Sequence, residues 1–304
     1  MKLVFLTLLL TLGLFSKEIT PSEVYMQTIV IEKQVELLLQ HYKIEYKSVP
    51  MEKRLKIKTV LKPRNVWQKT YEILIKINIL RKKHGMATIA PSNLSPVLHK
   101  NSDMVYEQTQ RILTELEIFK FRNQIKYKEF KKTIYTDKTA SDVFDELSYI
   151  STMFDILNEE EISISLIFGA NMRIYDDITL ILQNLEIKNT TIPREKKLDA
   201  TLEDNYLLTM QMLHKIKQLQ IISGISHVDF SNFRQEKISM SDLFTLSQMT
   251  IAELQTIKAY MGITTITPVA TTYFTKSLAE VNQIISWNRR KLNLIKSLDI
   301  GVKK

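Results

Sequence analysis

The sequence predicts an all-α fold of seven or eight long amphipathic helices, arranged as an irregular helical solenoid or a multi-helix bundle. Three observations support this prediction. A two-residue pattern recurs seven times, apolar residues follow each copy at helical spacing, and residues typical of helix starts precede several copies. The pattern does not match a tetratricopeptide unit, because the intervals vary and only one strong helix per unit is visible.

The recurring pattern is an aliphatic residue followed directly by an aromatic one. Its copies are Val24-Tyr25, Val66-Trp67, Val105-Tyr106, Val143-Phe144, Ile174-Tyr175, Asn205-Tyr206 and Leu243-Phe244, and only the sixth has a polar first member. Seven, eleven and fourteen positions after the first residue of each pair the chain is apolar, apart from Thr250 and Lys188. Steps of four and three place these residues on one stripe of an α-helix. Repetition favours a structural role for the aromatic rings, which we expect to pack between neighbouring helices.

The predicted helix starts carry capping residues. Thr20-Pro21-Ser22-Glu23 is a capping box, in which the hydroxyl accepts a backbone N–H and the carboxylate reaches back to the cap. Thr139, Thr201 and Ser239 are each followed three residues later by an aspartate, which also suits the positive end of a helix. The second helix starts at Lys62-Pro63 and has no good cap.

The intervals between pairs leave long connections between the helices. Helices of roughly 18–20 residues imply connections of roughly 11–22 residues, long enough for parallel or antiparallel neighbours. We expect one helical repeat region over 17–304, with two halves meeting near 123–138. The segment 54–60 alternates like a strand but has no obvious partner, and 271–297 suggests a last helix without a clean copy of the pair.

The first sixteen residues predict a secretory signal peptide. Met1-Lys2 is followed by an apolar run from Leu3 to Phe15 and a small residue, Ser16. We expect cleavage after Ser16; the alternative is an uncleaved anchor, although the run is short for spanning a bilayer. No later stretch is apolar enough to cross a membrane. We therefore expect an exported, periplasmic protein, with a Gram-positive surface as the alternative.

Composition limits the chemistry and the partners. The chain of 304 residues has no cysteine, which excludes disulfides, thiol catalysis and zinc–thiolate sites. Its formal net charge is +9, with basic clusters such as Arg81-Lys82-Lys83 and Lys126-Lys128-Lys131-Lys132. Another envelope protein is the expected partner, and anionic envelope polymers or lipid head groups are alternatives. Export makes nucleic acid an unlikely partner.

No motif in the sequence establishes a catalytic, metal or cofactor site. The five histidines lie too far apart for a two-histidine helical metal face, and there is no phosphate-binding glycine loop or nucleophile elbow. We therefore expect no cofactor and no enzymatic activity. Candidate contacts to a partner or ligand are Trp67 with the nearby Arg64, and Trp287 with Arg289 and Arg290, where the indole could stack on an arginine.

These features favour an exported, non-enzymatic interaction or scaffold protein. The alternative is a ligand-binding sensory or transport accessory protein with a pocket between helices. An enzyme acting on envelope polymers is a third possibility, which would need acids or a nucleophile gathered from separate helices. A scaffold predicts an extended groove or apolar surface, a ligand binder predicts an enclosed pocket, and an enzyme predicts carboxylates or histidine clustered in a cleft.

Overall fold

The fold is all-α, as predicted. A computed structural model describes residues 18–54, 56–92, 95–96, 101–126, 128–130, 133–233, 237–268 and 273–298. The expected signal peptide, 1–16, lies outside them. The described residues form eight α-helices and two short 3-10 helices: α2 (Pro21–His41), η1 (Met51–Lys53), α3 (Pro63–Lys83), α4 (Ser102–Arg122), α5 (Ala140–Asn158), α6 (Ile164–Asn184), α7 (Leu202–Ile222), η2 (Phe230–Asn232), α8 (Met240–Tyr260) and α9 (Leu278–Asn293).

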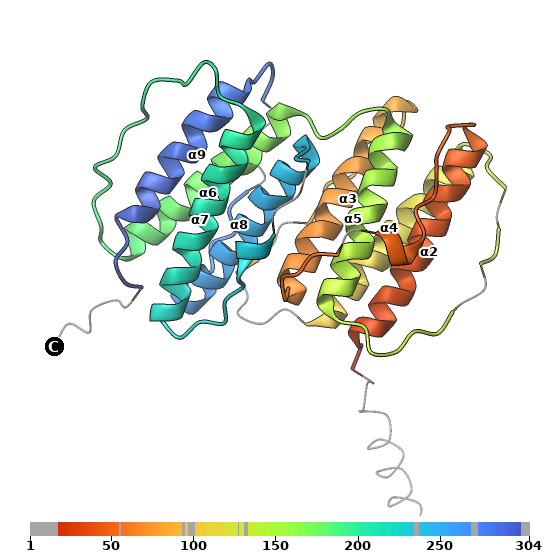
Figure 1. Cartoon of the computed structure of the whole chain (residues 1–304), viewed down its shortest axis with the longest axis horizontal. Coiled ribbons are helices and arrows are strands. Elements are labelled where there is room, and N and C mark those ends of the chain that lie inside the picture. The colour runs from red at the N-terminus through yellow and green to blue at the C-terminus, as the bar shows by residue number, and fades with distance from the viewer. Residues whose placement is uncertain are drawn as a thin grey trace, which may run out of the picture.

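The helices form two four-helix bundles of the same topology (Figure 1). In the first bundle α2 packs against α4 and α5, and α3 packs against the same two helices. In the second bundle α6 and α7 each pack against α8 and α9, so the first and second helices are diagonal in both. The bundles meet through α3 and α8. Two halves were expected to meet near 123–138. The described residues of that segment instead connect α4 to α5 of the first bundle, and the bundles are joined at 159–163.

The four helices of a bundle run in the same direction. Near the starts of the first-bundle helices, the Ile19 N–H donates to Asp103 (3.0 Å), the Lys138 N–H to Ser22 (3.0 Å) and the Leu61 N–H to Ser141 (3.0 Å). Each connection within a bundle must therefore return along a helix about 30 Å long. This return explains the length of the connections, because about nine extended residues are needed to cover that distance.

The strand-like segment 54–60 is part of such a return. Its described residues run along α5, where the Ile57 N–H donates to Asp145 (3.1 Å) and the Thr59 carbonyl accepts from Ser141 (3.0 Å). An extended segment packed on one side produces the same alternation as a strand. The described residues contain no β-strand.

One copy of the repeat was placed in the wrong register by the sequence pattern. The other pairs begin three residues after the helix start, and in α6 that position is Ile167-Phe168 rather than Ile174-Tyr175. Seven residues are close to two helical turns, so both registers fall on one stripe. The stripe in α6 is Ile167, Ile174, Ile178 and Ile181, all fully buried. The α9 copy is Val281-Asn282, and the last four pairs then follow at a constant spacing of 38 residues.

The helices end in a common way. Seven of them are followed by a left-handed residue: Lys43, Gly85, Gln124, Glu159, Glu186, Gly224 and Gly262. The N–H of the next residue reaches back to the last turn, as in a Schellman motif. That next residue is apolar and at least half buried in six cases (Ile44, Met86, Ile125, Ile187, Ile225, Ile263), where the chain turns back along the bundle. The exception is the exposed Glu160, which leads from one bundle into the other.

The repeated aromatic residues anchor the returning segments. Tyr25 packs edge-on against Tyr135 at 5.1 Å, with the Lys138 ammonium over the Tyr25 ring at 4.6 Å. At the equivalent positions of the second bundle, Phe168 packs against Tyr273 at 4.9 Å and Lys276 lies over Phe168 at 4.8 Å. These contacts support the structural interpretation of the rings. Of the predicted aromatics, Tyr25, Trp67, Phe144, Tyr206 and Phe244 are buried, and Tyr106 and Tyr175 are half buried.

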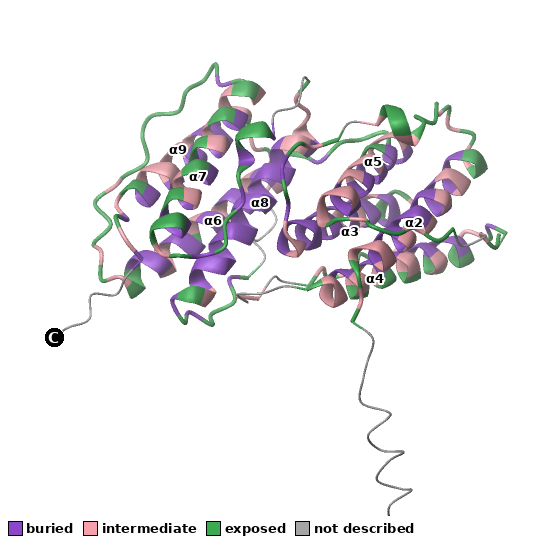
Figure 2. Ribbon diagram, turned by 60° about the horizontal axis from the view of Figure 1, so that its bottom comes forward, coloured by how far each residue is buried: buried purple, intermediate pink, exposed green. Residues whose placement is uncertain are grey.

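Buried residues follow the inner faces of the helices, and exposed residues follow the outer faces and connections (Figure 2). The layer four residues after each pair start is also fully buried and is polar in six helices: Thr28, Thr70, Thr109, Asn171, Thr209 and Ser247. Small side chains here let the helices approach closely, and their polar groups donate to backbone carbonyls of their own helices. Within the described part of the chain, no helix combines the length and apolarity needed to cross a bilayer.

Candidate functional site

A cleft of about 770 Å³ lies between the two bundles. Its floor is the outer face of α5, which has no other helix packed over it among the described elements. One wall is the returning segment 49–57, and the other is formed by the start of α8 and the residues that precede it. The cleft therefore exists because, among the described elements, α3 and α8 make the main helix-to-helix contact between the bundles and leave the outer face of α5 uncovered.

The face of α5 in the cleft is polar. Asp145, Ser148, Thr152 and Asp155 all line the cavity, at spacings of three, four and three residues, and Glu159 lines it just beyond the end of α5. Such spacing keeps side chains on one side of a helix. The Ser148 hydroxyl donates to the Phe144 carbonyl (2.8 Å) and the Thr152 hydroxyl to the Ser148 carbonyl (3.3 Å). Both hydroxyl oxygens still have acceptor capacity toward the cleft.

Arg54 fixes the wall formed by residues 49–57. Its guanidinium donates to both oxygens of Glu146 (2.8 Å each) and to Glu32 (2.5 Å), and it lies 3.7 Å from the centre of the Tyr149 ring. The Tyr149 hydroxyl in turn accepts the Val49 N–H at 3.0 Å. This wall is tied to both α2 and α5 through charged groups that are largely withdrawn from water.

Two carboxyl groups of α5 beside this wall titrate abnormally. Burial, followed by the neighbouring Glu32, raises the pKa of Glu146 to about 8. Burial also raises the pKa of Asp145 to about 6, although the hydrogen bond from the Ile57 N–H acts against this shift. The guanidinium of Arg54 therefore lies between two glutamates, of which Glu146 is largely protonated at neutral pH.

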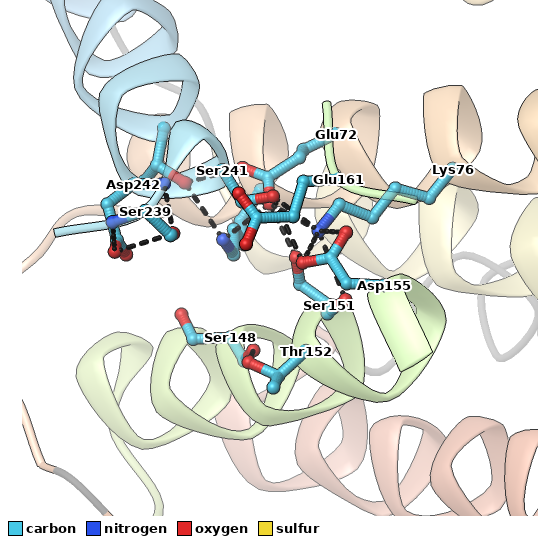
Figure 3. Close-up of polar contacts among 12 residues, drawn as sticks. Glu72, Lys76, Ser148, Ser151, Thr152, Asp155, Glu161, Ser239, Ser241 and Asp242 are labelled. Carbon is cyan, nitrogen blue, oxygen red and sulfur yellow. Dashed lines mark hydrogen bonds and ion pairs between the residues drawn. The ribbon is translucent and has the colours of Figure 1, made fainter. Parts of the chain in front are cut away.

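A buried ionic network joins α3, α5 and α8 at the side of the cleft (Figure 3). Glu72 accepts from Lys69 (2.7 Å), Ser151 (2.5 Å) and Thr245 (2.5 Å). Lys76 donates to Asp155 (2.6 Å), to the Ser151 carbonyl (3.1 Å) and to Ser241 (3.0 Å). Two ammonium groups thus balance two carboxylates in the contact between the bundles.

Most polar groups of this network have hydrogen-bond or ion-pair partners within the network. Burial alone would raise the pKa of Glu72, but Lys69 and Lys76 outweigh it and hold that pKa below its usual value. Burial lowers the pKa of Lys76 and raises that of Asp155. The Ser241 hydroxyl lies between these two groups, donating to Asp155 at 3.0 Å. Figure 3 shows Ser148 and Thr152 on α5 apart from these contacts, where a bound molecule could reach them.

A second ionic cluster joins the bundles farther along α3 and α8. Arg64 donates to both oxygens of Glu253 (2.9 Å each) and to the Ser226 carbonyl (2.9 Å). Asn65 and Gln220 also donate to Glu253, at 2.9 and 2.8 Å. Arg64, predicted as a partner or ligand contact, is thus committed to the contact between the bundles.

The other predicted contact residues do not line the cleft. Trp67 is only 4 % exposed and lies in the core. Trp287 is half buried, donates to the Thr191 hydroxyl (3.0 Å) and packs against Tyr175 at 4.7 Å. Arg289 donates to Gln211, and Arg290 donates to the Ser286 carbonyl (3.4 Å). The two predicted groups lie in different bundles, and the structure does not bring them together.

The cleft residues were missed because their signal is weak in the sequence. Acids and hydroxyls at helical spacing on the polar side of α5 look like an ordinary solvated face. Only the arrangement of a second bundle and a returning segment around that face makes it the floor of a cavity. The signal available in the sequence was the helical spacing of the hydroxyl residues Ser148 and Thr152 between the acids Asp145 and Asp155.

Among the described residues, no three histidine, aspartate or glutamate side chains are placed to hold a metal ion together. Comparison with known protein families, characterised proteins and solved structures gives no match to this chain.

Proposed function

We propose that this protein binds a small polar ligand in the cleft between its bundles. The observation that carries the proposal is the cleft itself, whose volume of about 770 Å³ falls within the range of small-molecule sites. Its lining combines acids and hydroxyls with the rings of Phe144, Tyr149 and Phe233. Such a lining can orient a ligand through its polar groups while an apolar part of the ligand packs against the rings.

The walls of the cleft support a preformed site. Arg54 holds one wall through Glu32 and Glu146, and the network around Glu72 and Lys76 holds the two bundles together. A site whose walls are fixed before binding loses less conformational entropy when the ligand enters. Together with the expected export signal, this arrangement suggests a sensory or transport accessory protein of the cell envelope, most simply in the periplasm.

Filling the cleft tests the proposal. Ser148→Trp and Thr152→Trp each place an indole over the floor, whereas Gln110→Trp places one on the exposed face of α4 as a matched control. Protein purified from its native envelope is denatured, and released small molecules are identified by mass spectrometry. We expect a released molecule from the unmodified protein and from Gln110→Trp, and none from the cleft variants. Equal release from all four proteins would contradict the cleft as the site.

A protein-interaction role is the second candidate. It is favoured by apolar side chains on the outer face of α4, where Phe121 is 82 % exposed and Ile118 is 41 % exposed. Exposed apolar pairs of this kind occur at contacts between proteins. A pull-down from the envelope fraction with the unmodified chain and with Phe121→Ser tests this role. Identical captured proteins in both samples would argue against this face as the contact.

A further inference from the structure

We propose that the ligand of the cleft is an elongated small polycation of the aliphatic polyamine class. This inference rests on the proposed ligand-binding function and specifies its chemistry. It follows from where the charges of the cleft lie, from which of them already have partners, and from their spacing along α5.

The fixed cations of the cleft are already neutralised. Arg54 is held by Glu32 and Glu146, and Lys69 by Glu72. The other two lining cations, Lys53 and Lys237, are exposed, so water screens their charge. The charged groups that remain for a ligand deeper in the cleft are therefore carboxylates.

Asp145 is the clearest of these carboxylates. It is half buried in the floor and accepts one backbone N–H, from Ile57 at 3.1 Å. None of the ion pairs found among the described residues includes it. Withdrawal from water penalises an ionised carboxylate unless a cation compensates it, and burial accordingly raises the pKa of Asp145 to about 6. The exposed Lys56 offsets this shift only in part, and a bound ammonium group would supply a direct ion-pair partner.

The far end of the floor is also negative. Asp155 lies in the last turn of α5, and Glu159, Glu160 and Glu161 follow the helix directly. Asp155 and Glu159 have lysine partners, Lys76 and Lys83, whereas Glu160 is exposed beside the cavity. The carbonyl groups at the end of α5 add the negative end of a helix dipole.

The spacing of these groups selects a long ligand over a compact one. Asp145 and Asp155 are ten residues apart on α5, which is about 15 Å along a helix, and Glu159 follows at the end of the helix. An extended tetraamine covers this span, with its terminal ammonium groups at the acids and its inner N–H groups at the Ser148 and Thr152 hydroxyls. Its methylene segments can lie against Phe144 and Phe233, whose rings are 6.0 Å apart.

Calorimetric titration of the purified full chain tests the ligand class. The probes are spermine, an uncharged oligoethylene glycol of similar length, and citrate. We expect saturable binding of spermine, weakened by added sodium chloride because exposed charges are screened. The double variant Asp145→Asn, Glu160→Gln should bind spermine about tenfold more weakly or worse, since it loses two charged hydrogen-bond acceptors. Glu107→Gln removes a charge from the exposed face of α4 and should leave the affinity unchanged.

The outcomes separate the ligand class from the site. Saturable binding of the glycol or citrate, abolished by Ser148→Trp, would overturn the polyamine class while leaving the cleft as a ligand site. Spermine binding of equal strength in all variants would show attraction to surface acids only and would also overturn the inference. Melting curves of each variant, recorded by circular dichroism, show whether a loss of binding reflects a loss of fold.

Discussion

The two bundles contain the same polar triad in opposite arrangements. In the first, Gln34 on α2 donates to Glu117 on α4 (2.9 Å), and Lys120 pairs with Glu117 (2.7 Å). In the second, the equivalent α6 position is Asp177, which accepts from Gln255 (2.8 Å) and Lys258 (2.7 Å) on α8. The carboxylate and the amide have exchanged helices, while the lysine has kept its place.

The two triads differ most in their exposure to water. The side chains of Asp177 and Lys258 are 0 % exposed, because the returning segment covers them with Thr267. In the first bundle Glu117 is 44 % exposed, and the residue equivalent to Thr267, Glu129, is itself exposed. The comparison shows that an identical helix topology can enclose both members of a charge pair or leave the carboxylate open to water while the lysine stays buried, depending on how closely the return packs.

The largest effect should come from breaking the enclosed triad. Asp177→Asn leaves the Lys258 ammonium buried without its carboxylate, which should lower the free energy of unfolding by about 3–5 kcal/mol. Glu117→Gln removes a carboxylate that is 44 % exposed and can be replaced by water beside the buried Lys120, so it should cost less, about 1 kcal/mol. Urea unfolding of both variants checks this difference. Equal losses of unfolding free energy in the two variants would show that coverage of the second triad by the returning segment does not change the contribution of its charge pair to stability.

A smaller but still large effect is expected at the contact between the bundles. Glu253→Gln leaves the buried Arg64 without a carboxylate and should cost about 3 kcal/mol. Amide exchange should accelerate most in α3 and α8 and least in α4 and α9, which lie away from this contact. Lys83→Ala, which removes an exposed ion pair, is the control. Uniform acceleration in all helices would argue against a separate role for this contact.

The pH dependence of stability should arise in the first bundle. The pKa of Glu146 is raised to about 8 in the folded state, against an ordinary value of 4.5. The folded state thus binds this proton more tightly than the unfolded state does. Protonation of Glu146 therefore contributes to the free energy of unfolding in full below pH 4.5, and this contribution is lost as the pH rises toward 8. The expected loss is on the order of a few kcal/mol. Glu146→Gln should flatten the stability profile between pH 5 and 8, and an unchanged slope would contradict this assignment.

The smallest expected effect compares two equivalent helix starts. The Thr201 hydroxyl caps α7 by accepting the Asp204 N–H (3.1 Å), whereas Lys62, at the same place before α3, has no side-chain acceptor. Thr201→Ala should cost about 1 kcal/mol, and Lys62→Thr should add roughly 0.5 kcal/mol. Thermal unfolding monitored by circular dichroism measures both changes. Destabilisation by Lys62→Thr would show that the lysine has another role at this site.

The sequence predicted the helices well because their signals are local. Capping residues at Thr20, Thr139, Thr201 and Ser239, together with apolar stripes, define most helix starts and buried faces. The register error at Ile174 arose because a shift of seven residues keeps the stripe in phase. The alternating segment 54–60 was ambiguous for a related reason, since packing on one side imposes the same pattern on any extended chain.

The spatial arrangement and the cleft could not be predicted in the same way. Helix pairing depends on contacts between residues far apart in the chain, such as Arg64 with Glu253. Arg64 and Trp67 were predicted as contact residues because a large ring lies near a charged residue in the sequence. In the structure Trp67 lies in the core and Arg64 pairs with Glu253. Asp145 and Ser148 lacked any distinguishing neighbour in sequence. Their position becomes informative only once the second bundle is placed beside α5.

The parallel direction of the helices has a consequence for how the chain folds. Helical proteins usually fold quickly because neighbouring helices form local hairpins with short loops. In each bundle here, only the second and third helices are both consecutive and packed together. The other three packed pairs are separated by at least one full helix, and one of them joins the first helix to the fourth. Loop closure must therefore precede most stabilising contacts. We expect folding to be slow for an all-α protein of this size, which would leave a newly made chain unfolded for longer before its bundles close.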